Sequence, residues 1–322
     1  MIIGTVGTGA IVETILENVQ KVEGISCAAV YSRKEESGKK LAGKFQIQKV
    51  YTDYDAMCRD ELIDFIYIAS PNSLHYEQTK KALLHGKNVI CEKPFTPSLT
   101  QARELAALAR EKHLFLFEGI TTMYQPNYQI IREHLSSLGN LKMALCTFCQ
   151  YSSKYDAFKA GELPNVFNPA FAGGALMDIN LYNIYFIVGL FGKPDRIEYF
   201  AGKHQNGIDT HGILILQYPH LICECTGAKD SWCENSVQLL GDMGYIHVTP
   251  GSSNCQEVRI VRKGKEEIRE KQPESPWFYE IEGMVRQVQN QNYAECYKRL
   301  DKTLEVVDVL EQARQSAGIT FE

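Results

Sequence analysis

The sequence predicts an α/β protein in which a doubly wound parallel sheet is followed by an α+β domain with a large, mostly antiparallel open sheet. Three observations lead to this prediction. Short apolar runs alternate with helical patterns through residues 1–119, which is typical of βαβ units. From residue 195 onward, strand patterns follow one another across short turns, which indicates antiparallel pairing. The length of 322 residues suits two domains.

The domain boundary is placed at Gly119, which closes the sixth strand pattern of the first half. This gives a cofactor-binding domain over 1–119 and a domain for substrate binding and oligomerisation over 120–322. Helices are expected at 278–291 and 303–316, and the second is able to pack back on the first domain. Strands of the second half are expected at 141–151, 195–201, 211–218, 221–228, 235–240, 244–249 and 257–262.

Composition and charge exclude several classes of protein. Hydrophobic residues make up 44% and charged residues 23%, the balance of an ordinary globular protein. A net charge of −5 argues against nucleic acid or an anionic membrane as the main partner. We expect no apolar run long enough to cross a bilayer and find no pattern of a signal peptide, so the expected location is the cytoplasm.

Ten cysteines are present, and most of them fall inside apolar runs. Buried, reduced thiols of a cytoplasmic protein fit this distribution. Cys146 and Cys149 have the spacing of a redox or zinc pair, but they lie in a strand-like run with no second ligand pair nearby. Packing is therefore the favoured interpretation, and no metal is expected.

A glycine-containing turn follows the first strand pattern directly. Gly7-Thr8-Gly9 stands between the apolar run 1–6 and a helical pattern, which is the order of a dinucleotide-binding Rossmann loop. Gly7 permits the tight turn, and Gly9 lets the backbone approach a pyrophosphate. Ala10 and Ile11 open the helix, whose N-terminal N–H groups attract phosphate. Val12 replaces the third glycine of the motif.

The end of the second strand indicates which nicotinamide cofactor is bound. Strand 25–31 is followed by Ser32 and Arg33, with no acidic residue at the strand end. An acid here would bind the ribose 2′-hydroxyl of NAD, whereas an arginine suits the 2′-phosphate of NADP. NADP is therefore the expected cofactor and NAD the alternative. The competing interpretation is that Arg33 is a solvated loop residue.

Two further strand ends carry polar residues. In the stretch 88–94, a short apolar strand pattern leads into Glu92, Lys93 and Pro94, and the proline marks where the chain leaves the sheet. Ligands of open α/β sheets bind at such strand ends, and a desolvated lysine there has a lowered pKa. The alternative is a solvated Glu–Lys pair. Four more residues that follow strand 64–69 are expected near the cofactor: Ser70, Pro71, Asn72 and His75.

One segment of the second half contains candidate catalytic residues. Gly173-Gly174 ends a loop, and a long apolar helical pattern carries Asp178 and Tyr182 four residues apart, on one helix face. A carboxylate in an apolar helix is costly unless it is paired or used, and an acid beside a phenol can bind a hydroxyl and transfer its proton. The alternative is a dipole-stabilised Asp178 and a packed Tyr182.

In order and spacing, these motifs resemble the Gfo/Idh/MocA oxidoreductase family along nearly the whole chain. The stretches that carry the resemblance are 7–9, 31–33, 70–75, 86–87, 92–94, 173–178 and 304–318. The resemblance implies that Lys93 and Asp178 are catalytic. Tyr182 stands where many members have histidine, as in members that resemble dihydrodiol dehydrogenase and glucose–fructose oxidoreductase. Asn180 replaces a glycine that is frequent in the family.

The resemblance further implies an NAD(P)-dependent dehydrogenase that transfers a hydride between nicotinamide and a secondary alcohol or carbonyl of a sugar, cyclitol or diol. Tyr182 or Lys93 would then exchange the hydroxyl proton. The open sheet of the second domain is often the oligomer interface of such proteins, so a homodimer or homotetramer is expected.

Two other functions compete with this interpretation. The first is a non-catalytic NAD(P)-binding sensor of the same fold, although such a protein would have no need of Lys93, Asp178 and Tyr182 together. The second is a biosynthetic reductase acting on an amino-acid precursor, which would require arginines for a substrate carboxylate. Residues 150–180 contain no arginine, which weakens the second alternative.

Overall fold

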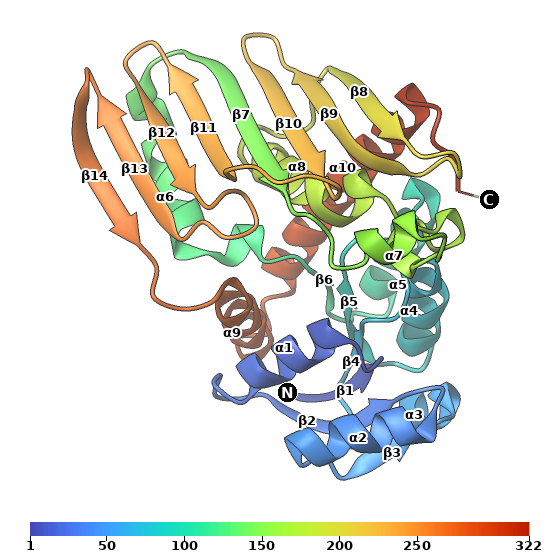
Figure 1. Cartoon of the computed structure of the whole chain (residues 1–322). Helices are drawn as coiled ribbons and strands as arrows, with labels where there is room; N and C mark the ends of the chain where they lie inside the picture. The colour runs from blue at the N-terminus through green and yellow to red at the C-terminus, as the bar shows by residue number, and fades with distance from the viewer. Residues whose placement is uncertain (322) are drawn as a thin grey trace. The chain divides into compact units, whose positions relative to one another are not determined.

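The computed structural model describes residues 1–321 (Figure 1). Contacts divide the chain into two compact units. The first unit consists of Met1–Ile120 and Trp277–Leu304, and the second consists of Thr121–Pro276 and the residues from Glu305 onward. The chain therefore returns to the first unit after completing the sheet of the second.

A six-stranded parallel sheet forms the centre of the first unit. Its order is β3-β2-β1-β4-β5-β6, so the strand order reverses between β1 and β4, as in a doubly wound fold. The strands are β1 (Ile2–Val6), β2 (Ser26–Tyr31), β3 (Lys49–Tyr51), β4 (Phe65–Ile68), β5 (Asn88–Glu92) and β6 (Leu116–Gly119). The helices that follow them are α1 (Ala10–Val19), α2 (Glu35–Phe45), α3 (Tyr54–Arg59), α4 (His75–Leu84) and α5 (Leu99–Glu111). The predicted Rossmann-type sheet is confirmed.

The apolar runs of this unit are explained by burial on both faces of the sheet. All four residues of β4 are at most 2% exposed, which is why the strand has no polar alternation. Val12, which replaces the third glycine of the motif, is fully buried. Its side chain therefore belongs to the core of the unit.

An eight-stranded sheet forms the second unit, in the order β14-β13-β12-β11-β7-β10-β9-β8 (Figure 1). The strands are β7 (Leu141–Cys149), β8 (Arg196–Lys203), β9 (Asp209–Gln217), β10 (Ile222–Ala228), β11 (Ser236–Gly241), β12 (Gly244–Thr249), β13 (Glu257–Arg262) and β14 (Lys265–Lys271). Only β7 and β10 pair in parallel, and the other pairs are antiparallel. The prediction of a large, mostly antiparallel sheet is confirmed.

Strand β14 was not predicted from the sequence. Its segment, 265–271, consists almost entirely of charged residues and shows no apolar alternation. It pairs with β13 and ends the sheet, so the backbone ladder with one neighbouring strand defines it.

The helices of the second unit are α6 (Pro126–His134), α7 (Tyr155–Lys159), α8 (Leu181–Phe191) and the second half of α10 (Tyr293–Ser316). Helix α9 (Pro276–Gln289) and the first half of α10 belong to the first unit. Helix α10 begins ten residues before the predicted start at 303. Its first turns are held by aromatic packing, with the ring of Tyr293 stacked at 4.1 Å on that of Phe115, a contact that helical periodicity does not reveal.

One helical stretch, Pro169–Phe191, has the length and composition of a membrane span. This differs from the expectation that no apolar run in the chain would be long enough. However, 72% of its apolar window is buried inside the fold, as in the core helix of a globular domain. Its apolar character is thus explained by packing in the second unit.

Candidate functional site

The carboxyl ends of β1, β2, β4 and β5 bring the predicted cofactor residues to one edge of the parallel sheet. This follows from the sheet order, because the ends of parallel strands meet at the same edge. The residues placed directly after these strand ends, or at them, are Gly7, Gly9, Ala10, Ile11, Ser32, Arg33, Ser70, Pro71, Asn72, His75, Glu92 and Lys93.

The turn after β1 has a backbone shape that only glycine adopts without strain. Gly7 has φ +111°, and a Cβ there would lie 2.7 Å from the carbonyl oxygen of Ala69. Around Gly9, by contrast, no atom lies within 4 Å of a Cβ position. Gly9 caps α1 and has no side chain, so no cap side chain covers the N-terminal end of the helix. This geometry fits a dinucleotide pyrophosphate.

The end of β2 presents Arg33 in an exposed position. Ser32 is held beside it, because its N–H donates to the carbonyl oxygen of Tyr51 at 3.0 Å and its Oγ accepts from the N–H of Lys34 at 3.3 Å. The loop that carries Arg33 is therefore anchored at both ends, while the guanidinium is accessible to a ligand.

His75 is buried and fixes two loops at this edge. Its Nδ1 lies 2.9 Å from the carbonyl oxygen of Pro94, and its Nε2 lies 3.0 Å from that of Ser70. Burial lowers the pKa of this imidazole, despite the two carbonyl contacts. The ring therefore joins the loop after β4 to the loop after β5. The Ser70 hydroxyl donates in turn to Gln78 at 2.6 Å.

The loop after β4 continues as a compact turn. Asn72 opens a short 3₁₀ helix that ends at Leu74, and the N–H of Leu74 donates to the carbonyl oxygen of Pro71 at 2.9 Å. The turn leads directly into α4, so Pro71 and Asn72 are held at the sheet edge by the helix that follows.

Glu92 organises the start of the loop that carries Lys93. Its carboxylate is 7% exposed, accepts a hydrogen bond from the Tyr67 hydroxyl, and accepts another from the Lys93 N–H at 3.2 Å. The predicted pair is thus not a fully solvated one, because Glu92 lies inside the unit. Lys93 is half-buried at the strand end.

Two further carboxyl groups lie near Glu92, and sequence reasoning missed both. Glu118 is 6% exposed and accepts from the N–H of Phe95 at 3.2 Å. Glu280, on α9, is 2% exposed, and burial together with the charges of Glu92 and Glu118 raises its pKa well above the usual value. Glu118 was visible as an acid at a strand end. Glu280 lies in an ordinary amphipathic helix pattern and gave no signal.

In the second unit, Asp178 and Tyr182 lie on consecutive helical segments. Asp178 belongs to a π-helical turn, Leu176–Asn180, and Tyr182 to the first turn of α8. The sequence predicted one continuous helix here. The carboxylate of Asp178 forms an ion pair with Lys229, and the ring of Tyr182 meets that of Phe148 edge-on at 5.8 Å. Such π turns are frequent at functional sites.

The π turn is held against β10 by Asn180. This residue is fully buried, and its Nδ2 donates to the carbonyl oxygen of Cys225 at 2.9 Å. It can approach the strand because Gly227 has no side chain, and a Cβ on Gly227 would lie 2.6 Å from the Cβ of Asn180. Asparagine at this position therefore has a packing role that glycine could not fill.

In this region of the second unit, sequence reasoning missed Lys229. It follows β10 directly and is 5% exposed, a rare location for a lysine. Like Lys93, Lys229 directly follows a strand, and this position is the sequence signal that points to it. The rule that ligands bind at strand ends applies to open parallel sheets, whereas the strand patterns of the second half indicate an antiparallel sheet.

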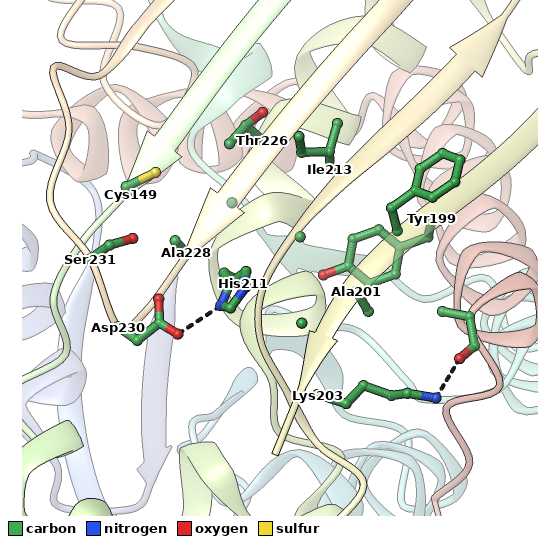
Figure 2. Close-up of a pocket in the computed structure, with 15 residues that line it drawn as sticks. Cys149, Tyr199, Ala201, Lys203, His211, Ile213, Thr226, Ala228, Asp230 and Ser231 are labelled. Atoms are coloured by element: carbon green, nitrogen blue, oxygen red, sulfur yellow. Dashed lines mark hydrogen bonds and ion pairs between the residues drawn. The ribbon is translucent and has the colours of Figure 1, made fainter.

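A hollow of about 890 Å³ lies elsewhere on the second unit, along β8, β9 and β10 (Figure 2). His211 and Asp230 meet within it at 2.7 Å, and Phe200 and Ile213 contribute apolar surface. Neither Asp178 nor Tyr182 lines this hollow. It is therefore a feature of the sheet surface and distinct from the predicted catalytic segment.

Two family models match the chain. An oxidoreductase family with an NAD-binding Rossmann fold matches residues 1–120, and the GFO/IDH/MocA C-terminal domain matches residues 128–247. Together they cover well over half of the sequence.

Curated relatives span nearly the full length. The chain is 32% identical over 317 residues to the scyllo-inositol 2-dehydrogenase (NADP(+)) IolU of Bacillus subtilis, covering 98% of this chain and 97% of that protein. It is 27% identical to the trans-1,2-dihydrobenzene-1,2-diol dehydrogenase of Mus musculus, covering 99% and 97%.

Solved structures show the same fold at lower sequence identity. A 3-ketoreductase from Actinomadura kijaniata in complex with NADP and TDP-benzene superposes with a TM-score of 0.86 at 20% identity, covering 98% of this chain and 97% of that one. An aldose-aldose oxidoreductase from Caulobacter crescentus superposes with a TM-score of 0.85 at 20% identity, covering 99% and 97%.

The prediction of a nicotinamide-dependent oxidoreductase is confirmed by these matches at the level of the family. The fold, the order of the motifs and the comparisons agree along the whole chain. The protein belongs to the Gfo/Idh/MocA family of oxidoreductases.

Proposed function

We propose that this protein is an NADP-dependent dehydrogenase that interconverts a secondary alcohol and a carbonyl on a sugar, cyclitol or related diol. The observation that carries the proposal is its 32% identity, over 98% of its length, to a protein named as an NADP(+)-dependent scyllo-inositol dehydrogenase. The retention of Lys93, Asp178 and Tyr182 supports an enzyme rather than a sensor.

Each catalytic candidate has a role that its chemistry permits. Bound NADP would exchange a hydride with the carbinol carbon of the substrate. Tyr182 or Lys93 takes the hydroxyl proton in oxidation and returns it in reduction. Asp178, ionised beside Lys229, accepts a hydrogen bond from a substrate hydroxyl.

The residues at the edge of the parallel sheet divide among the parts of the cofactor. Gly7, Gly9 and Ala10, with Ile11 behind them, hold the pyrophosphate at the start of α1. Arg33, next to Ser32, binds the 2′-phosphate. The nicotinamide ribose side is assigned to the residues of the loops after β4 and β5: Ser70, Pro71, Asn72, Glu92 and Lys93. His75 contributes by fixing both loops through their carbonyl groups.

A two-stage screen tests the function. Thermal-shift measurements with NADP present would first identify which sugars, cyclitols and diols stabilise the protein, because a ligand of the native state raises its stability. NADPH formation at 340 nm is then followed with each stabilising compound. We expect turnover of at least one polyol. Tight NADP binding without turnover of any such compound would instead support the sensor.

We also propose that a second copy of the chain covers the open face of the eight-stranded sheet. Large apolar side chains are exposed there on four neighbouring strands: Met143, Phe200, Ile213 and Ile222, with exposed fractions of 42–63%. Phe200 is directly opposite Ile213 in the pairing of β8 with β9, and both line the hollow of Figure 2. Ile222 is opposite Met143 in the pairing of β10 with β7, four residues along β10 from Thr226, which is opposite Ile213. Light scattering should give a dimer or tetramer, and Phe200→Glu with Ile213→Glu should give monomers.

The proposed location is the cytoplasm. All ten cysteines are free in the structure, and eight of them are buried. Such thiols persist in a reducing compartment, where disulfides are rare.

A further inference from the structure

The segment that carries Asp178 is surrounded by an electrostatic arrangement centred on Lys229. The backbone of Lys229 is fixed on both sides, because its N–H donates to the carbonyl oxygen of Thr210 at 2.8 Å and its carbonyl oxygen accepts from the N–H of Ser152 at 2.8 Å. Its side chain is 6% exposed. A buried ammonium group is unfavourable unless neighbouring groups compensate its charge.

Three groups provide that compensation. The Nζ atom forms an ion pair with the carboxylate of Asp178 and lies 5.6 Å from the ring centroid of Phe167, within cation–π range. Burial raises the pKa of a second acidic residue, Asp209, and the charge of Lys229 opposes that shift. The buried cation thus has one ion-pair partner, one aromatic ring and one further acidic residue that interacts with it electrostatically.

The second carboxylate is itself part of the scaffold of the helix. Asp209 is 1% exposed and accepts hydrogen bonds from the Leu176 N–H and the Tyr199 hydroxyl, both at 2.7 Å. Leu176 begins the π turn that contains Asp178. The same cluster thus fixes both the start of this turn and its acidic side chain.

We propose that Lys229 is a positioning residue of the reaction, which acts through Asp178. It holds the Asp178 carboxylate ionised and in one orientation, so that this group is ready to accept a substrate hydroxyl. This role rests on the proposed function. Other titratable groups belong to the same part of the second unit: Tyr182 on α8 follows Asp178 by four residues, the Tyr199 hydroxyl on β8 donates to Asp209, and Arg314 on α10 interacts electrostatically with Asp209 and Glu311.

The first test compares Lys229→Met with Lys229→Arg in steady-state turnover with NADP. Removing a cation in contact with a carboxylate raises the carboxylate pKa, by about one unit or more. The acidic limb of the kcat profile should therefore move to higher pH in Lys229→Met, with kcat reduced about tenfold or more near that limb. Lys229→Arg keeps the charge and should restore the profile in large part.

A double-mutant cycle asks whether Lys229 acts through Asp178. Once Asp178→Asn has removed the carboxylate, adding Lys229→Met should cost no further factor in kcat. If the kcat losses of the two single variants multiply in the double variant, the proposal is overturned. An unchanged pH profile of kcat in Lys229→Met would also overturn it.

A readout without turnover separates this inference from the proposed function. Carbon-13 NMR titration of the Asp178 carboxyl, assigned by its absence in Asp178→Asn, should give a higher pKa in Lys229→Met than in the unmodified protein. This result is expected even if no polyol is turned over. An equal pKa in both proteins would refute the role of Lys229.

A matched control tests whether the loss of any lysine from the second unit changes the kcat profile. Lys193→Met removes another lysine of the second unit, which pairs with Asp308 at the surface. It should leave the kcat profile unchanged. Thermal denaturation and NADP affinity are measured on each variant, and if Lys229→Met is not folded, Lys229→Gln, which keeps a polar end group, takes its place in the kinetic and NMR comparisons.

Discussion

The Asp209 carboxylate accepts a hydrogen bond of 2.7 Å from the Leu176 N–H, and so ties the start of β9 to the start of the candidate catalytic segment. This contact is close because Gly174 leaves room for it. A Cβ at Gly174 would lie 2.1 Å from Asp209 Oδ1, and the φ of +115° already disfavours other residues. The double glycine of the sequence therefore has a definite steric function.

Gly174→Ala should destabilise the protein by about 2 kcal/mol or more, because it combines backbone strain with a clash. Chemical denaturation measures the loss. Gly161→Ala is the control, since Gly161 has φ +93° but nothing within 4 Å of its Cβ position. The control should cost only about 1 kcal/mol, and equal losses would show that the clash with Asp209 is relieved at little cost.

Lys93→Ala should abolish turnover while leaving NADP binding nearly intact. In the proposed function the amine takes part in the chemistry, whereas the pyrophosphate is assigned to the turn after β1. Nicotinamide fluorescence or calorimetry gives the affinity, and absorbance at 340 nm gives the rate. Full activity in this variant would refute the assignment of Lys93.

Tyr182→Phe removes only a hydroxyl group and should lower kcat by about 10²- to 10⁴-fold if that hydroxyl transfers the proton. Tyr128→Phe is a suitable comparison, because the Tyr128 hydroxyl donates to the carbonyl oxygen of Phe186 at 3.0 Å inside the core. That variant should lose about 1 kcal/mol of stability and retain its kcat. A small effect of Tyr182→Phe would leave proton transfer to Lys93.

Arg33→Ala should raise the KM for NADP by about tenfold or more and leave the KM for NAD nearly unchanged, since a guanidinium contact to the 2′-phosphate is worth more than a neutral hydrogen bond. Initial rates with both cofactors measure the preference. Lys34→Ala, one residue further along the same loop, is the control. An equal rise in the KM for NADP and for NAD would show that Arg33 does not recognise the 2′-phosphate.

Glu280→Gln should stabilise the protein at alkaline pH. Because burial raises the folded-state pKa of Glu280 above its unfolded value near 4.5, its stabilising contribution is present below pH 4.5 and is lost as the pH rises through the folded-state pKa. Glutamine is neutral throughout, so the variant should exceed the unmodified protein by about 1 kcal/mol or more at pH 8.

Thermal denaturation from pH 5 to pH 9 checks this dependence. Glu282→Gln, on the same helix, serves as the control, because the Glu282 side chain is 43% exposed and pairs with Arg286 at 2.9 Å. Its stability should show no comparable change across the pH range. A Glu280 variant that follows the same pH curve as the unmodified protein would mean that the neighbouring carboxyl groups carry the titration.

Much of the fold was predictable because its signals are local. Alternating apolar runs and helical patterns predict a parallel sheet, and the backbone freedom of Gly7 predicts the turn after β1. The edge where Arg33, Asn72 and Lys93 lie follows from the topology alone, since parallel strands place their carboxyl ends together. The early start of α10 and the charged strand β14 were not predictable, because aromatic packing and a backbone ladder define them.

The sequence by itself thus determined the sheet of the first unit, the cofactor turn and the identity of the candidate catalytic residues. Tertiary structure alone decided which groups surround them. Lys229 reaches Asp178 across 51 positions, and Asp209 reaches Leu176 across 33. The physical reason is that the stabilisation of a buried charge depends on neighbours brought by other strands, whereas periodicity and glycine conformation depend on the adjacent residues.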